Sequence, residues 1–365
     1  MLDIESTVVS DQVLVNALAD GTYAEVADAY EVSRGRVYAA ACRLGARKNE
    51  LRIQTRKQER KRLQREFAQS VLNATATADV LDFLEGLPDA YCELALTSPP
   101  YNVSKPYLSS PGADSYHHVF YLGWLLQVVS EMARVLKPGG VLFLQVGSTK
   151  DAQGNLLPID IMVFQYLQAL GLQFQSRIAW VVPHGLTPKR RLAERYETAL
   201  VFSKGPIATF NPDPARTPQQ NPGKRAYRGP RKGELSGHPF GAHPTNVWAI
   251  PNAGANRKDG VEGHPAQMPI ELARRAIQVY SMPGDIVLDS FSGSGTTQAA
   301  CIQTGRAFTG ADLYYEDIRN QRLAKISPDL VSALPGITDE SLAVWNAQAV
   351  PVHIPASTPE QLTLA

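Results

Sequence analysis

The 365-residue chain has few cysteines, no long apolar run and no excess of charge of one sign. Its three cysteines, Cys42, Cys92 and Cys301, lie far apart, which excludes a disulfide framework and a zinc-binding spacing and favours a reducing compartment. No run approaches the ~18 apolar residues of a membrane span, and the amino-terminal segment is acidic, unlike a signal peptide. We therefore expect a soluble, cytoplasmic protein with no metal site and no membrane partner.

Charge is distributed unevenly, although the formal net charge is only +1. The stretch from 46 to 67 is strongly basic and contains no proline or glycine, so it predicts an exposed helix. This helix is either a solvated linker or a helix that follows a phosphate backbone. The length allows two or three folding units, and we assign residues 1–70 to the first, an all-α unit.

Within that unit, the segment 23–38 resembles a helix-turn-helix. Its first helix would run to Tyr30, and Ser33 would cap the second. Arg34 and Arg36 would then lie near the start of the second helix, where recognition helices meet bases. Two interpretations stay open: contact with DNA through Arg34 and Arg36, or a packing or dimerisation module.

A proline-rich loop follows a short apolar run, 92–96, which predicts a buried strand. Each proline removes a backbone donor and fixes φ, so the loop is rigid and its carbonyls are free to accept hydrogen bonds. Ser98 offers a hydroxyl, Pro99 a carbonyl and Tyr101 a flat ring, with Pro100 between them. Two acceptors can hold the hydrogens of an aromatic amine and make its nitrogen more nucleophilic, while the ring stacks on the base.

Strand and helix patterns alternate from 71 to 204 and again from 261 to 326, which predicts a mostly parallel sheet with helices on both faces. The sequence 137–140, Lys-Pro-Gly-Gly, is expected to end a long helix that starts at Tyr116. Between the two halves, 205–260 is rich in Pro, Gly and basic residues and predicts an irregular nucleic-acid recognition region. Its DNA-binding candidates are Lys224, Arg225, Arg228, Arg231 and Lys232. The tail, 327–365, is expected to lie on the surface or to be disordered.

A glycine-rich turn between a strand and a helix spans 289–297. Such a turn lets the backbone approach a ligand closely, and the following helix start favours a carboxylate or a phosphate. It has no Gly-Lys-Ser/Thr, which argues against a P-loop. A second strand ends in Asp312 about 20 residues later, where an acid holds a ribose diol. Together these features indicate a cofactor that contains a nucleoside.

With both loops considered, residues 71–326 resemble an S-adenosylmethionine-dependent DNA amino-methyltransferase of the β arrangement. The resemblance is carried by the catalytic motif at 97–102, the segment 180–204, the segments 246–251 and 264–269, and the cofactor loop at 289–297. Met268 is a departure, because the family often has lysine there. The resemblance implies a Rossmann-like class I methyltransferase fold with a mixed, mostly parallel seven-stranded sheet.

The resemblance also implies roles for residues and partners for the chain. The target base would be flipped out, stacked on Tyr101 and held at its amine by Ser98 and Pro99. The cofactor residues would be Asp79, Gln267, Asp289, Phe291, Gly293, Gly295, Thr296, Thr297 and Asp312. Double-stranded DNA would be the substrate, with a second copy of the chain and a cognate restriction endonuclease as further candidate partners, and the enzyme would associate with the nucleoid.

The identity of the base depends on Ser98. Relatives that modify adenine mostly carry Asp at this position, whereas those that methylate N4 of cytosine mostly carry Ser, so the resemblance favours cytosine N4. Adenine N6 stays open as an alternative, because cytosine and adenine both present a ring acceptor beside the amine. Methylation of RNA and a non-enzymatic helix-turn-helix regulator are the remaining alternatives.

Overall fold

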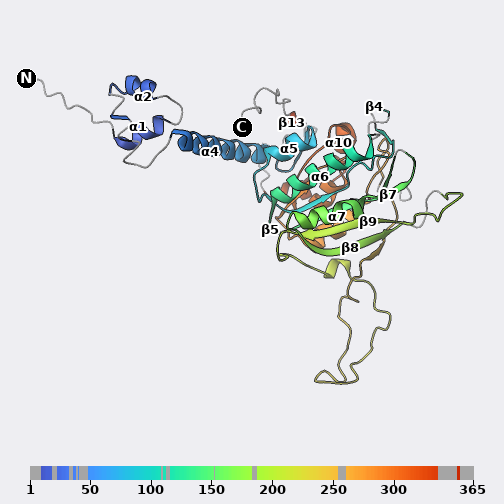
Figure 1. Ribbon diagram of the computed structural model, residues 1–365. Helices are drawn as coiled ribbons and strands as arrows, with labels where there is room; N and C mark the ends of the chain where they lie inside the picture. Colours follow the sequence, from blue (N-terminus) through green and yellow to red (C-terminus); the bar gives the residue numbers. More distant parts are fainter. Residues whose placement is uncertain are drawn as a thin grey trace, which may run out of the picture. The chain divides into compact units, whose positions relative to one another are not determined.

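The computed structural model describes residues 10–18, 23–32, 36–37, 40, 48–107, 110–111, 116–151, 153–182, 187–253, 260–335 and 352–353. The chain divides into two compact units, Met1–Phe67 and Ala68–Ala365 (Figure 1). None of the described helices is both long enough and apolar enough to cross a membrane.

The amino-terminal unit contains the short helices α1 (Asp11–Ala17) and α2 (Tyr23–Ala29) and the start of α4 (Lys48–Ser70). Ser10 caps α1, because its side chain accepts a hydrogen bond from the Val13 amide. A small apolar core joins α1, α2 and the helical residues that follow: Leu14, Val15, Leu18, Val26, Ala27, Val37 and Ala40.

The predicted turn after the first helix is present, since α2 ends at Ala29 and Glu31 adopts a positive φ of 53°. Arg36 is helical and half-buried, whereas Ser33 and Arg34 lie outside the described residues. Val13 and Tyr30 fit the helical period of the sequence, but both are exposed.

The larger unit is built on a sheet of nine strands in the order β10-β8-β9-β5-β2-β11-β12-β1-β13 (Figure 1). All pairs are parallel except those made by β9, which runs antiparallel to both β5 and β8. The strands are β1 Ala74–Thr77, β2 Cys92–Thr97, β5 Leu136–Val146, β8 Gln173–Val181, β9 Tyr196–Ser203, β10 Val247–Ala249, β11 Ile286–Asp289, β12 Ala307–Ala311 and β13 Val352–His353.

The predicted fold class, a mixed and mostly parallel sheet, is confirmed. In the part of the chain that the structure describes, the sheet has two more strands than the predicted seven. Both are short edge strands, β10 and β13. Two antiparallel pairs lie outside this sheet: β3 Pro106–Tyr107 with β4 Ser110–Pro111, and β6 Ser148–Lys150 with β7 Leu156–Pro158.

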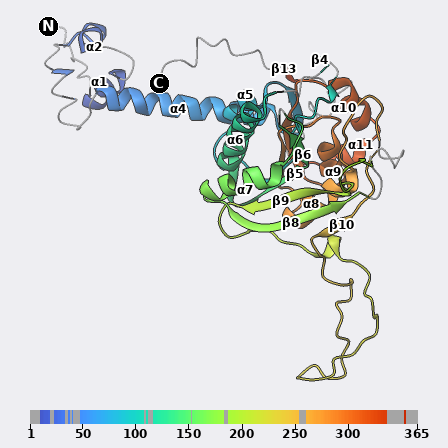
Figure 2. The same ribbon diagram turned by 45° about the vertical axis from the view of Figure 1, so that its right-hand side comes forward.

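Helices cover both faces of the sheet (Figure 2). One face carries α5 Val80–Gly86, α6 His118–Val135 and α7 Ile159–Ala169; the other carries α8 Ile270–Tyr280 and α9 Thr296–Thr304, with α10 Glu316–Leu323 and α11 Pro328–Ser332 against α9. Helix α8 shows why the layers form: apolar residues at helical spacing, Leu272, Ala273, Ala276 and Ile277, are fully buried in the core beneath the sheet.

The predicted long helix ends where expected, since α6 stops at Val135 with Leu136 as its C-cap. Residues 137–140, however, do not lie between elements but form an irregularity inside β5, where the register shifts between Cys92 and Leu94 of β2 and Gly139 adopts a φ of 79°. The start of the tail lies mostly on the surface, as expected, but two of its side chains are buried. Val331 in helix α11, which begins at Pro328, and Leu334 just beyond this helix pack into the main core.

The region between the two halves of the sheet leaves the body as a long exposed excursion, residues 213–245 (Figure 1). Its described regular structure is one 3-10 turn, Asp213–Ala215, and two isolated bridges, Thr217 to Ala242 and Arg225 to Leu235. The predicted irregular character is therefore present, and the two bridges join the outgoing segment of the excursion to the returning one.

Candidate active site

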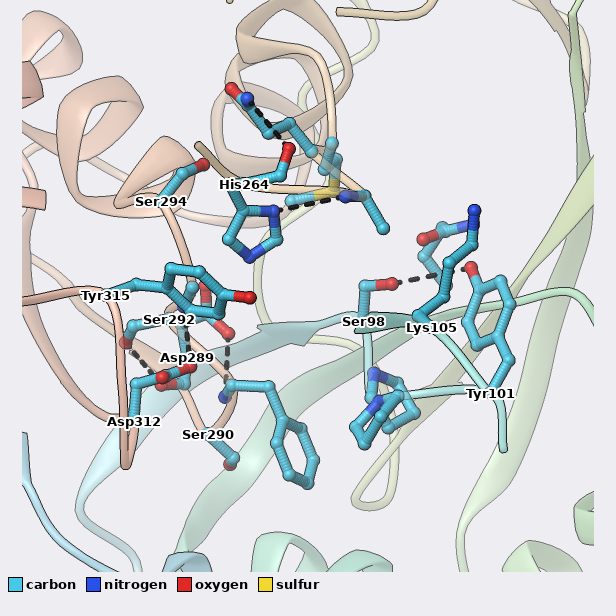
Figure 3. Close-up of a pocket in the computed structure, with 18 of the residues that line it drawn as sticks. Ser98, Tyr101, Lys105, His264, Asp289, Ser290, Ser292, Ser294, Asp312 and Tyr315 are labelled. Atoms are coloured by element: carbon cyan, nitrogen blue, oxygen red, sulfur yellow. Dashed lines mark hydrogen bonds between the residues drawn. The ribbon is translucent and has the colours of Figure 1, made fainter. Parts of the chain in front are cut away.

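A cavity of about 880 Å³ lies at the carboxyl ends of neighbouring parallel strands. Ser98 follows β2, Ser290 follows β11, Asp312 follows β12, and Asp79 lies just beyond β1; all four line the cavity. The amino-terminal end of the antiparallel β9 reaches the same edge and adds Glu197. The two predicted loops therefore face one space (Figure 3).

The proline loop forms one side of this cavity. Ser98 Oγ lies 3.4 Å from Tyr101 Oη, and Tyr101 Oη donates a hydrogen bond of 2.8 Å to Glu197 Oε2. Gln145 Nε2 donates to the same Glu197 oxygen. Burial and the neighbouring Glu197 carboxylate raise the pKa of Tyr101 well above its ordinary value, so its hydroxyl stays protonated.

The loop is held rigidly from behind. Tyr121 Oη donates a hydrogen bond of 2.8 Å to the Pro100 carbonyl. Asn102 has a positive φ of 58°, and its side chain exchanges two hydrogen bonds with the backbone of Tyr116, at 2.6 and 2.7 Å. Thr97, fully buried, donates 2.8 Å to Asp289 Oδ1 and so ties the proline loop to the glycine loop.

The glycine loop forms the opposite side of the cavity. Gly293 has a φ of 47°, and a Cβ there would lie 2.7 Å from His264 Nε2, so the imidazole rests directly on this glycine. Gly295, with a φ of 78°, precedes the first residue of α9. Buried Arg319 donates to the Gly293 carbonyl at 3.2 Å, and Arg322 donates to the Ser294 carbonyl at 2.8 Å.

Two carboxylates and one imidazole in the cavity have shifted pKa values. Burial raises the pKa of Asp289 to about 6, against the opposing hydrogen bonds that its carboxylate accepts. Burial also raises the pKa of Asp312, although Arg319 lies 3.8 Å away and opposes the rise. Burial, together with Arg322 and Arg319, lowers the pKa of His264 to about 4, so its ring is neutral near pH 7.

The structure brings most of the predicted cofactor residues together. Asp79, Gln267, Asp289, Phe291, Gly293, Thr296, Thr297 and Asp312 all line the cavity, and Gly295 lies in the same loop. Asp312 uses one oxygen for the Gly293 amide and the other for the Tyr314 amide, each at 2.8 Å. The ring centroid of Phe291 lies 5.5 Å from that of Trp124.

Asp79, Thr296 and Gln267 have structural partners too. Asp79 caps α5 by accepting from the Leu81 amide at 2.8 Å. Thr296 Oγ1 donates to the Met268 carbonyl at 3.1 Å. The Gln267 amide spans a loop, since it exchanges hydrogen bonds with the Val261 backbone and accepts from Arg322 at 2.8 Å.

The predicted DNA-binding residues do not join this cavity. Lys224, Arg225, Arg228, Arg231 and Lys232 lie on the exposed excursion. Arg225 donates to the Gly233 carbonyl at 2.6 Å, and Arg231 pairs with Glu234 at 3.0 Å. The guanidinium of Arg228 lies 5.7 Å from the centre of the Tyr227 ring. Arg34, the other predicted contact beside Arg36, falls outside the described residues.

Sequence reasoning missed several residues of the site. Glu197 lies in the segment 180–204 but had no predicted site role; it contacts Tyr101 across 96 residues and Gln145 across 52, and such long-range contacts leave no local pattern in the sequence. Arg319 and Arg322 lie in a highly charged helix, and such a composition predicts that both side chains are exposed to solvent. Their only sequence signal is their spacing of three, which places both on one face of α10.

Both described cysteines, Cys92 and Cys301, are fully buried free thiols, as their apolar surroundings in the sequence indicate. Burial raises the pKa of each thiol above its ordinary value. They are therefore core residues without thiolate character. The described residues contain no cluster of side chains that could hold a metal ion.

Comparison with known proteins agrees with this geometry. The sequence matches the N6 and N4 methyltransferase family, described as DNA methylase, over residues 92–322. The chain belongs to this DNA methylase family. It is 37% identical over 273 residues to the type II methyltransferase M.BglII of Bacillus subtilis, which covers 74% of each chain.

Other relatives of this DNA methylase are named for different bases. The DNA adenine methyltransferase YhdJ of Escherichia coli K12 is 32% identical over 66% of this chain and 78% of its own. A solved structure of PvuII DNA methyltransferase (cytosine-N4-specific) covers 75% of this chain and 91% of its own, with a TM-score of 0.52 and 19% identity. The second likeness supports the fold.

Members of the DNA methylase family take a methyl group from S-adenosylmethionine, and the cavity fits that group. One buried hydroxyl that lines it, Ser290 Oγ, has no hydrogen-bond partner within the described chain. Buried polar groups of this kind need partners, which a polar ligand supplies. Asp312 would have lone pairs left to accept from ribose hydroxyls, and the start of α9 would favour the carboxylate of the methionine moiety.

Proposed function

We propose that this DNA methylase transfers a methyl group to the exocyclic N4 amine of a cytosine flipped out of double-stranded DNA. The observation that carries the proposal is the position of the Ser98–Tyr101 loop, which faces Ser292 and Asp312 across one cavity (Figure 3). An amine held at the first loop lies beside a cofactor held at the second.

The chemistry assigns one task to each group of the loop. Ser98 Oγ and the Pro99 carbonyl accept the two hydrogens of the amine and direct its lone pair across the cavity, while the ring of Tyr101 holds the base in register. S-adenosylmethionine, when bound, supplies the electrophilic methyl group. With the amine held by Ser98 and Pro99, methyl transfer would form an N–C bond, break an S–C bond and leave one amine proton to pass to solvent. Because both described thiols are buried and protonated, this direct displacement needs no covalent adduct with a cysteine.

The choice of cytosine rests on Ser98, a neutral hydroxyl where adenine-modifying relatives mostly carry a carboxylate. The alternative is adenine N6, and it has support in the 32% identity to an adenine methyltransferase. Both bases present an amine beside a ring acceptor, so the same cavity chemistry applies to either.

The excursion 213–245 supports a role in holding the duplex. It contains six Lys and Arg residues against two Asp and Glu residues, and it is exposed along most of its length. Cationic side chains beside aromatic rings, as in Arg228 with Tyr227, suit phosphate and base contacts. We further propose a homodimer, from the resemblance to the family, and a cognate restriction endonuclease as a partner, which the 37% identity to a type II methyltransferase supports.

The decisive experiment is incubation of the protein with unmethylated genomic DNA and isotopically labelled S-adenosylmethionine, followed by nuclease digestion and mass spectrometry of the nucleosides. N4-methylcytosine is the expected product. N6-methyladenine would keep the enzyme and overturn the base. Product on RNA alone would reassign the polymer, and failure to bind the cofactor would favour the regulator interpretation.

A further inference from the structure

Glu197 occupies a position that no part of the proposed chemistry yet uses. It is the second residue of β9, and because β9 runs antiparallel to β5, its amino-terminal end lies at the strand edge that holds the cavity. Its side chain accepts hydrogen bonds from Tyr101 Oη at 2.8 Å and from the almost fully buried Gln145. Glu197 also lines the cavity itself.

The chemistry of these groups fixes the direction of a hydrogen bond that distance alone leaves open. A carboxylate only accepts, so the single Tyr101 hydroxyl proton is committed to Glu197. In the 3.4 Å contact between Ser98 and Tyr101, the serine must then be the donor. Its proton points toward the tyrosine, and its lone pairs remain available to a base amine in the cavity.

We propose that Glu197 is a positioning residue that acts through Tyr101 to make Ser98 a hydrogen-bond acceptor for the target amine. This inference rests on the proposed role of Ser98 in methyl transfer. In the absence of the carboxylate, Tyr101 could donate to Ser98 instead, and the serine proton would turn toward the amine. Two donors would then face each other, which opposes binding of the base in its reactive orientation.

The surroundings keep this arrangement in one state. Gly147, just beyond β5, leaves room for the tyrosine, since a Cβ at this position would lie 2.9 Å from Cε2 of the Tyr101 ring. The raised pKa of Tyr101 keeps its proton in place near neutral pH. Gln145 donates to the same carboxylate oxygen and so restricts the rotation of the Glu197 side chain.

A double-mutant cycle on the full chain tests the proposal. The chain of hydrogen bonds from Ser98 through Tyr101 to Glu197 is the proposed relay. Tyr101→Phe keeps the ring but removes the hydroxyl in the middle of this relay, and Glu197→Ala removes the carboxylate at its end. Each variant is expected to lower single-turnover methylation about 10-fold to 100-fold, while the Kd for S-adenosylmethionine changes less than about 3-fold. The double variant is expected to be no slower than the worse single variant, because both substitutions break the same chain of hydrogen bonds.

Two further variants separate this role from a loss of folding. Glu197→Gln keeps the side-chain shape and one oxygen that can accept from Tyr101. It therefore tests the proposal even if Glu197→Ala destabilises the protein, and its methylation rate is expected to recover much of the loss seen in Glu197→Ala. Glu194→Ala is the matched control, an exposed carboxylate three residues earlier that accepts a hydrogen bond from Ser148 at 3.2 Å, and it is expected to leave the rate unchanged.

The outcomes distinguish this inference from the proposed function. If the wild-type protein methylates neither base of DNA, the proposed function itself fails. If the wild type is active but the losses from Tyr101→Phe and Glu197→Ala multiply in the double variant, the two residues act independently and the relay is wrong. An active Glu197→Ala variant with normal single-turnover rate would also overturn it.

Discussion

At the scale of single residues, the role of Ser98 gives the sharpest prediction about activity. Ser98→Ala removes one of the two acceptors proposed for the amine and touches no cofactor residue. We expect S-adenosylmethionine to bind with unchanged affinity in calorimetry, while single-turnover methylation of DNA falls about 100-fold or more. Undiminished methylation by a variant that binds the cofactor normally would refute the role.

Asp289 and His264 predict how stability depends on pH. The pKa of Asp289 is raised from its ordinary 3.8 to about 6. Its stabilising contribution to the free energy of unfolding is therefore fully present below pH 3.8 and is lost as pH rises through 6. The pKa of His264 is lowered from 6.5 to about 4, so its contribution is present above pH 6.5 and is lost as pH falls through 4. Between pH 4 and 6 the two trends oppose each other.

Asp289→Asn separates the two contributions. The amide oxygen can still accept from Thr97, so the fold should persist, but the acid's pH dependence is gone. The difference in unfolding free energy between variant and wild type should shift by up to about 3 kcal/mol between pH 4 and pH 6.5, with the variant favoured at the higher pH. Denaturant melts at a series of pH values measure it, and a pH-independent difference would contradict the assignment.

What the sequence reveals about the site depends on whether residues are neighbours in the chain. Ser98 and Tyr101 share one loop, and Gly293 and Gly295 share another, so local chemistry alone predicted both sides of the cavity. Glu197 could not be found in this way. Its importance comes from the register of an antiparallel strand, which brings it to Tyr101 across the sheet.

At the scale of elements, two glycines with positive φ flank helix α9, Gly293 three residues before its first residue and Gly305 directly after its last, and the two are expected to behave differently. A Cβ at Gly293 would collide with His264, whereas a Cβ at Gly305 has nothing within 4 Å. Both Ala variants strain the backbone by about 1 kcal/mol. Only Gly293→Ala should also weaken S-adenosylmethionine binding, by about 10-fold or more.

Thermal melts and calorimetry on the two variants measure this difference. Gly305→Ala, with its φ of 70° at the carboxyl end of α9, serves as the matched control for backbone strain. Its Tm should fall while its cofactor Kd stays unchanged. Equal losses of affinity in the two variants would mean that the close approach of His264 does not shape the cofactor site.

Long apolar or strongly periodic elements were predictable, and short or interrupted ones were not. The run 92–96 and the helix α8 follow their sequence patterns closely. Strand β1 was missed because Ala74–Thr77 contains only alanine and threonine, and its burial comes from pairing with β12 and not from its own hydrophobicity. The Pro-Gly-Gly at 138–140 predicts a break between a helix and the following strand, yet the parallel pairing of β5 with β2 continues around these residues.

The excursion 213–245 gives a prediction about DNA affinity. Arg225 and Arg231 make side-chain hydrogen bonds within the excursion, so Lys224, Arg228 and Lys232 are the better positions to change. Replacing these three with Gln should weaken DNA binding and lower the slope of log K against log salt by about 3. Lys325→Gln, at an exposed position two residues after the end of α10, is the control. An unchanged slope in the triple variant would exclude phosphate contacts by the excursion.

At the scale of the whole molecule, the cavity and the core beneath it belong to only one of the two compact units. Every residue that lines the cavity, and every buried residue of the core beneath it, belongs to Ala68–Ala365. The amino-terminal unit has its own apolar core, built from residues such as Leu14, Leu18 and Val26. A chain that begins at residue 68 should therefore fold, bind S-adenosylmethionine with unchanged affinity and retain methyl transfer on short duplexes.

The effect of that truncation on DNA binding decides between the two interpretations of the first unit. If Arg36 and the basic stretch contact DNA, removing them should raise the KM for long duplexes and reduce the salt dependence of binding, with kcat unchanged. If the unit serves packing or dimerisation, KM at low salt should stay the same, and sedimentation should report a smaller assembly. Loss of cofactor binding on truncation would instead show that the two units do not fold independently.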